Sequence, residues 1–214
     1  LKNKGFNVIL CIQDKLHQLT KTSKVANSII NFEEGNLFKN GAWIPMMSLP
    51  KYLEVSPNNP IIKDQYIFTE KFMIDKWQEI ISKEKSIVIG INWQGNPNHE
   101  TTLSKGRSIP LNSFAKLADI KEIKFLSLQK GYGSEQMTDC NFKNRFVDCQ
   151  ALINETWCFS ENAAIILNCD LIITSDTSIA HLAGGLGQKT WILLKDVPEW
   201  RWGLEEESSF WYSS

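Results

Sequence analysis

DLIITSDTSIAHLAGGLG, residues 170–187, joins an apolar run to a stretch of small side chains through one acid and two hydroxyl residues. The apolar run predicts a buried strand, and residues 178–186 predict a helix. Asp176, Thr177 and Ser178 then lie where the first backbone N–H groups of that helix have no partner within it. Such a helix start attracts anions, so the stretch predicts an anion site at the end of a strand.

Strand and helix patterns alternate on both sides of this stretch. Apolar runs that predict further strands occupy residues 86–93, 123–129, 145–148 and 190–194. Patterns that predict further helices occupy residues 70–84, 111–119 and 160–168. In the first of these helices, one face collects Phe72, Met73, Trp77, Ile80 and Ile81. Apolar strands that alternate with helices are typical of a parallel α/β sheet whose strands are buried on both faces.

The first quarter of the chain also carries strand patterns. FNVILCIQ at residues 6–13 and SIINF at residues 28–32 predict two strands. DKLHQLTK after the first strand predicts a short helix, and EEGN after the second predicts a turn. Residues 43–53 are apolar but contain Pro45 and Pro50, so they predict a loop or a short helix.

Residues 54–65 read EVSPNNPIIKDQ, and their two prolines and two asparagines predict a linker. A chain of 214 residues suits one large domain or two small ones. We therefore expect two α/β lobes, residues 1–69 and 70–214, with a hinge at residues 54–70. A cleft between them should face the carboxyl ends of the strands.

The overall charge gives the chain no general attraction for anionic partners. Its 23 Lys and Arg residues are balanced by 24 Asp and Glu residues, so we expect neither nucleic acid nor a membrane surface as a partner. No stretch approaches the roughly 20 apolar residues of a membrane span. Five cysteines without a C-x-x-C pair predict reduced thiols and a cytoplasmic protein, with Cys11 and Cys169 in apolar surroundings. Any anion site must therefore be local.

Basic residues occur in two further loops at the predicted carboxyl ends of the strands, where parallel sheets bind their ligands. A long polar loop carries Arg107, and a shorter glycine-rich loop carries Lys130. Because these loops leave the same edge of the sheet, we expect Arg107 to share one pocket with Asp176, Thr177 and Ser178.

Five motifs follow one another in the order and spacing of the family 9-like glycosyltransferases: GINWQGNP, RSIPL, SLQKG, DLIITSDTSIAHLAGGLG and WILLKDVPEWRW. The chain resembles the relatives of ADP-heptose:lipopolysaccharide heptosyltransferases, of the type often linked to tetratricopeptide repeats. The resemblance covers residues 86–202 and, more loosely, residues 6–53. It implies a GT-B fold of two Rossmann-like lobes, with the N-terminal lobe incomplete here. It also implies transfer of a sugar from a nucleoside-diphosphate sugar to an acceptor hydroxyl, without a metal or a cofactor.

The same resemblance implies roles in donor or phosphate binding for Arg107, Lys130, Asp176, Thr177, Ser178 and His181. A protonated His181 would neutralise charge on the departing diphosphate. The catalytic base is expected to lie outside this chain, because nothing before Phe6 supplies the acid or base that family members carry after their first strand.

Structural explanations stand beside these roles. Thr177 and Ser178 could cap the helix. Arg107 could be a surface residue, and His181 could be a packed or a surface residue. Asp176 could belong to a purely structural turn. Its alternative roles are to order the loop by accepting backbone N–H bonds or to accept sugar hydroxyls.

Glycines and tryptophans near the end of the chain also allow more than one interpretation. Gly184, Gly185 and Gly187 come at the end of the predicted helix, which favours close packing against the sheet and a C-cap at Gly187 over a phosphate loop. Trp200 and Trp202 could stack on a base or sugar, or could pack between the lobes.

Two other functions remain open at this point. The chain could bind a nucleotide or nucleotide sugar without turnover. It could also be a sugar-phosphate or nucleotide enzyme of another class, because a shared sheet architecture does not determine function.

Overall fold

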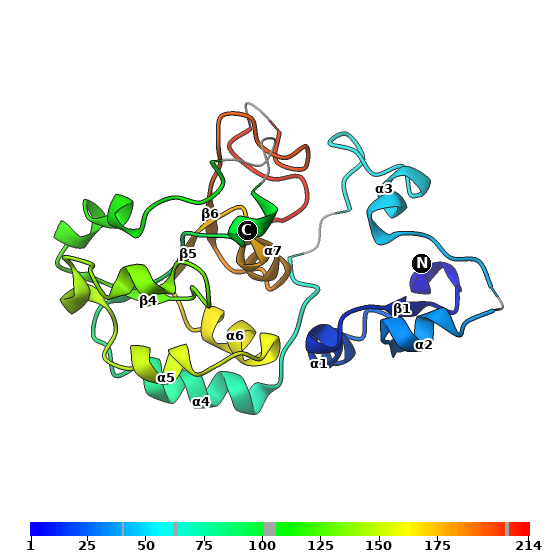
Figure 1. Cartoon of the computed structure of the whole chain (residues 1–214). Helices are drawn as coiled ribbons and strands as arrows, with labels where there is room; N and C mark the ends of the chain where they lie inside the picture. Colours follow the sequence, from blue (N-terminus) through cyan, green and yellow to red (C-terminus); the bar gives the residue numbers. More distant parts are fainter. Residues whose placement is uncertain (40, 62–63, 101–105, 204–205) are drawn as a thin grey trace.

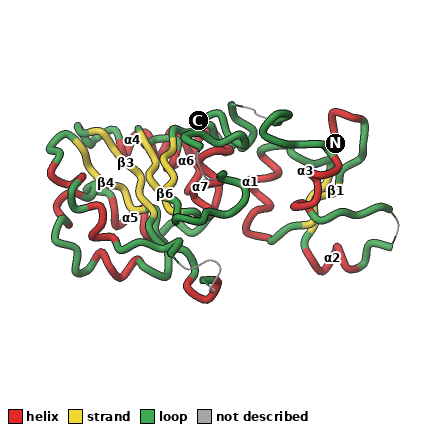
Figure 2. Tube along the Cα trace, turned by 90° about the horizontal axis from the view of Figure 1, so that it is seen from above, coloured by secondary structure: helices red, strands yellow, loops and turns green. Residues whose placement is uncertain are grey.

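The computed structural model describes residues 1–214 except 40, 62–63, 101–105 and 204–205 and shows a mixed α/β protein with two parallel sheets (Figure 1). The larger sheet has the strand order β4-β3-β5-β6 (Figure 2). Its strands are β3 (Ile87–Asn92), β4 (Ile123–Ser127), β5 (Leu171–Ser175) and β6 (Thr190–Leu193). The smaller sheet pairs β1 (Ile9–Cys11) with β2 (Ser28–Ile30). The parallel α/β class predicted from the sequence is confirmed.

Three helices cover one face of the larger sheet. The helices of the described chain are α1 (His17–Thr22), α2 (Phe32–Asn36), α3 (Leu49–Tyr52), α4 (Lys71–Ile81), α5 (Gln150–Asn154), α6 (Phe159–Ile166) and α7 (Ser178–Gly185). Trp77 from α4, Ile165 from α6 and Leu182 from α7 pack in one buried cluster with Ile172 of β5. This cluster is the main core of the molecule.

Within the described residues, loops and short 3₁₀ turns cover the opposite face in place of an α-helix. The helix predicted for residues 111–119 is wrong, because the chain forms two separate 3₁₀ turns, Leu111–Phe114 and Leu117–Asp119. Leu111 and Phe114 are both buried in the cluster on this face. A spacing of three residues aligns side chains in a 3₁₀ turn, so this turn can bury both.

Several shorter predictions need correction as well. The strand predicted at residues 145–148 is reduced to one bridge between Phe146 and Phe125. Residues predicted as the EEGN turn lie in helix α2, because Asn31 and Glu34 form a reciprocal capping box. The side chain of Cys11 is exposed, whereas Cys169 is buried.

Strand β6 at the sheet edge is only partly covered, in contrast to the buried strand that the sequence predicts.

All five cysteines are free thiols. Among the described residues, no helix combines the length and apolar character that crossing a membrane requires.

The two sheets lie on either side of the segment 54–70, but the segment is not a free linker. The backbone N–H groups of Tyr66 and Ile67 both donate to the Gly185 carbonyl, at 3.0 and 2.9 Å. Helix α1 also joins the two halves, because Leu19 is 4% exposed and packs in the main core. The division into domains at residues 69 and 70 stays a prediction.

The glycines at the end of α7 have two different roles. Gly187 has φ +70°, and the Gly187 and Gln188 N–H groups bond back to Gly184 and Ala183. This Schellman geometry confirms the predicted C-cap. A side chain at Gly184 would meet Tyr212, and one at Gly185 would meet Ile67. These two glycines therefore pack against the linker and the C-terminal segment, and the prediction that they pack against the sheet is wrong.

Candidate functional site

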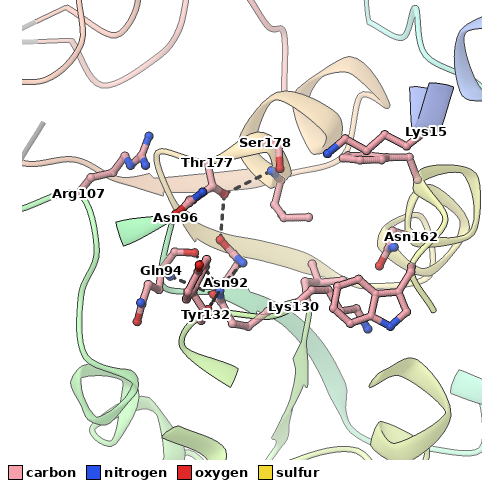
Figure 3. A pocket seen from close by; sticks show the side chains of 16 residues that line it. Lys15, Asn92, Gln94, Asn96, Arg107, Lys130, Tyr132, Asn162, Thr177 and Ser178 are labelled. Carbon is pink, nitrogen blue, oxygen red and sulfur yellow. Dashed lines mark hydrogen bonds between the residues drawn. The ribbon is translucent and has the colours of Figure 1, made fainter. Parts of the chain in front are cut away.

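A cavity of about 420 Å³ lies beyond the carboxyl ends of β3, β4 and β5 (Figure 3). Its size falls in the range typical of small-molecule sites. The described residues that line it are Lys15, Asn92, Gln94, Gly95, Asn96, Arg107, Leu128, Gln129, Lys130, Tyr132, Trp157, Phe159, Asn162, Thr177, Ser178 and Ile179.

Buried amide side chains fix the floor of the cavity. The Gln129 Oε1 atom accepts hydrogen bonds from Asn92 Nδ2 at 2.9 Å, Trp93 N at 3.1 Å and Gln94 N at 3.0 Å. Its Nε2 atom donates to the carbonyls of Gln94 and Tyr132, at 2.9 and 2.6 Å. Since Gln129 is only 4% exposed, these bonds lock the loops after β3 and β4 together.

Thr177 connects this network to helix α7. Its Oγ1 atom donates to Asn92 Oδ1 at 2.9 Å and accepts from the Ile179 N–H at 3.3 Å, which makes it the N-cap of α7. A hydroxyl has one proton to donate, and this one is directed to Asn92. Thr177 therefore aligns the helix with the cavity, and it has no second proton to offer to a bound anion.

Ser178 is the first residue of α7 and is exposed to the cavity. Among the described residues, neither its backbone N–H nor its hydroxyl has a hydrogen-bond partner. The positive end of the helix dipole adds to these donors. Ser178 thus presents two donors at a position that favours negative charge.

Two of the predicted basic residues line the cavity. Arg107 lies at its far end, and its guanidinium occupies the space above Gly95, where a side chain would come within 2.5 Å of Nη2. The Arg107 Nε atom is buried and has no hydrogen-bond partner among the described residues. Lys130 donates from Nζ to the Ile153 carbonyl, and burial lowers the pKa of Lys130 to about 8. Both cations could pair with a bound anion.

A third cation comes from the N-terminal part of the chain, which carries the two-stranded sheet. Lys15 precedes α1, and in Figure 3 its ammonium points toward Ser178. None of the described lining residues is Asp, Glu or His, so three cations surround the cavity without a lining carboxylate. Sequence reasoning missed Lys15, because no local pattern places it beside the carboxyl edge of the other sheet.

Asn162 was also missed. It lines the cavity from α6 and is 7% exposed. Its Nδ2 atom donates to the Cys158 carbonyl at 2.9 Å, but its carbonyl oxygen has no hydrogen-bond partner among the described residues. A buried acceptor of this kind favours a ligand that carries an O–H or N–H donor. The only sequence signal was an asparagine in an otherwise apolar helix.

Two predicted site residues do not line the cavity. Asp176 directly precedes the lining residue Thr177, but it does not line the cavity itself. Its carboxylate makes no hydrogen bond with the described residues. His181 stacks on Trp202 with ring centroids 5.2 Å apart, and its Nδ1 atom lies 2.7 Å from Tyr212 Oη. Burial lowers the pKa of His181, and the charge of Arg201 acts in the same direction. These contacts favour a neutral, packed imidazole over the predicted cation.

The tryptophans that follow β6 also lie apart from the cavity lining. Trp202 is 5% exposed and packs on His181, so packing is the role that its contacts support. Trp200 is exposed and meets Trp211 edge to face. Neither tryptophan is placed to stack on a ligand in the cavity.

A second cavity of about 340 Å³ adjoins the first and shares Gln129, Lys130 and Trp157 with it. The described residues contain no group of three His, Cys, Asp or Glu side chains with the geometry of a metal site.

Comparisons of the chain with protein-family models, with curated proteins and with solved structures found no match.

Proposed function

We propose that the cavity binds the diphosphate of a nucleoside-diphosphate sugar, and that the chain belongs to a GT-B glycosyltransferase. The observation that carries the proposal is the set of three cations and the unpaired Ser178 donors around a cavity whose described lining contains no carboxylate. A diphosphate matches this set, because its oxygens accept charge-assisted hydrogen bonds from guanidinium, ammonium and backbone N–H groups.

In the proposed reaction a sugar passes from the donor to an acceptor hydroxyl. Negative charge builds on the departing diphosphate, and Arg107, Lys130 and the Ser178 donors would stabilise it where it forms. The acceptor hydroxyl also needs a base. The described lining offers no carboxylate or histidine for that step, so the proposal assigns the base to a group outside it.

The same lack of a lining carboxylate or histidine favours a second candidate, a module that binds the nucleotide sugar without turnover. The two are distinguished by incubating the protein with the nucleotide sugar that binds best and measuring release of nucleoside diphosphate. Release above the rate without protein supports an enzyme, and binding without release supports the module.

A cytoplasmic setting and a link to tetratricopeptide repeats stay part of the proposal.

A thermal-shift screen over UDP-, GDP- and ADP-sugars tests the binding step. A ligand at 100 times its Kd stabilises by about 2.7 kcal/mol, which corresponds to a Tm increase of about 5–10 °C for a chain of this size. We expect such an increase for at least one nucleotide sugar and none for the matching nucleosides or free sugars. Equal responses to the nucleotide sugar and its nucleoside would contradict the proposal.

A further inference from the structure

Lys15 belongs to the N-terminal part of the chain, which carries the two-stranded sheet. The other two cations of the cavity, Arg107 and Lys130, come from the part that carries the four-stranded sheet. Lys15 lies in the 3₁₀ turn Asp14–Leu16, directly before α1. Helix α1 is fixed to the other half, because Leu19 is buried in the main core and Thr22 Oγ1 donates to Glu70 Oε1 at 2.8 Å. Packing of α1 therefore holds the Lys15 backbone beside the cavity, although the Lys15 side chain is exposed.

The three cations do not converge on one point. In Figure 3 the Arg107 guanidinium lies at one end of the cavity and the Lys15 ammonium lies toward the other, with Ser178 between them. A single phosphate group offers its oxygens around one phosphorus atom, whereas two linked phosphoryl groups carry oxygens at two neighbouring positions. A row of donors with a cation at either end therefore favours the linked pair.

We propose that Lys15 makes the cavity selective for a diphosphate over a monophosphate. The inference rests on the proposed function, because it assigns the second phosphoryl group of the same ligand. Arg107 and Ser178 hold the first group, and Lys15 holds the second. The N-terminal half thus supplies a determinant of ligand specificity that the four-stranded sheet alone does not contain.

The size of the effect follows from the exposure of Lys15. An ammonium that donates to a phosphate oxygen forms a charge-assisted hydrogen bond, and loss of such a bond corresponds to roughly a tenfold change in affinity. Salt screens exposed charges, so the effect should shrink as ionic strength rises.

The test is calorimetric titration of the whole protein with inorganic pyrophosphate and with inorganic phosphate at one pH and ionic strength. The variants are Lys15→Gln, Arg107→Gln and the matched control Lys21→Gln, which removes an exposed charge of α1 that does not line the cavity. We expect Lys15→Gln to weaken pyrophosphate about tenfold and to leave phosphate within twofold. Arg107→Gln should weaken both anions, and Lys21→Gln should change neither.

The outcomes separate this inference from the function on which it rests. If the unmodified protein binds pyrophosphate and Lys15→Gln keeps the same ratio of the two affinities, the role of Lys15 is overturned and the proposed function stands. An equal loss for both anions is one such result, because Lys15 then acts only as a general attraction. If the unmodified protein binds neither anion, the proposed function fails and the inference fails with it.

Discussion

Two adjacent hydroxyl residues at the start of α7 have different surroundings. The Thr177 hydroxyl donates to Asn92 and caps the helix, whereas the Ser178 hydroxyl has no partner among the described residues. The first is therefore part of the fold, and the second is available to a ligand.

Alanine substitutions should separate these roles. Thr177→Ala should lower the free energy of unfolding by about 0.5–2 kcal/mol through the lost cap. Ser178→Ala should leave stability within about 0.5 kcal/mol and weaken nucleotide-sugar binding by about 0.5–1.5 kcal/mol. Urea unfolding and calorimetric titration of both variants measure the two effects. The reverse pattern would show that the ligand contacts Thr177 and that Ser178 is structural.

Lys130 gives the site a dependence on pH. Burial lowers its pKa to about 8, so the free site loses this charge as the pH rises from 7 to 9. A bound diphosphate favours the charged ammonium, and binding above pH 8 must therefore take up a proton. We expect affinity for an ADP-sugar to fall between pH 7 and pH 9. Lys130→Gln should bind more weakly and show a flatter pH profile. An unmodified protein with equal affinity at both pH values would exclude Lys130 from the site.

The residues that follow strand ends were accessible to sequence reasoning. Arg107, Lys130, Thr177 and Ser178 all follow apolar runs, and the carboxyl ends of parallel strands meet at one edge. Their part in binding stays a prediction. Lys15 was not accessible, because it reaches the cavity only through the packing of α1, which depends on contacts distant in sequence.

At the scale of the element, helix α7 is determined by both of its ends. Thr177 caps its start, and the Schellman geometry at Gly187 ends it against the segment that leads into α4. A side chain at Gly187 would meet the Asp64 carbonyl oxygen. Helix α7 therefore keeps one length and one direction, which aims its start at the cavity.

Gly187→Ala should lower the free energy of unfolding by more than about 1 kcal/mol, because it combines the strain of positive φ with a backbone clash. Gly131→Ala is the matched control, since Gly131 has φ +63° and nothing within 4 Å of an added Cβ atom. The loss in free energy of unfolding for Gly131→Ala therefore measures the strain of positive φ without a clash. If the two variants lose the same stability in urea unfolding, the clash with Asp64 does not exist in solution.

Elements with a strong local signal could be predicted, and those shaped by tertiary contacts could not. Strand β5 and helix α7 combine an apolar run, a cap and a C-terminal glycine, and all three signals agree. Residues 111–119 have helical periodicity over only two turns, and burial of Leu111 and Phe114 at a spacing of three favours the 3₁₀ turn.

At the scale of the molecule, the two sheets are joined by packing as well as by the chain. Leu19 belongs to α1 and yet is buried in the core of the four-stranded sheet. The Pro and Asn residues of the connecting segment suggest a free hinge, but they do not report that contact. The architecture of two sheets was therefore predictable, and the way in which α1 docks was not.

Leu19→Ala should lower the free energy of unfolding by about 2–5 kcal/mol, as for other leucines removed from a core. Leu37→Ala is the control, because Leu37 is 76% exposed and its loss should cost less than about 0.5 kcal/mol. Denaturant unfolding of both variants measures the difference. Equal stabilities would mean that α1 does not dock on the main core.

The central claim is that the cavity binds the diphosphate of a nucleotide sugar, and Arg107 tests it most directly. The measurement is calorimetric titration of the unmodified protein and Arg107→Gln with the nucleotide sugar that gives the largest thermal shift. We expect saturable binding to the unmodified protein and a loss of about 1.5–3 kcal/mol in the variant, as for hydrogen bonds to charged groups. Circular dichroism should show that the variant keeps its fold. Equal affinity of a folded Arg107→Gln variant, or no binding to the unmodified protein, would contradict the claim.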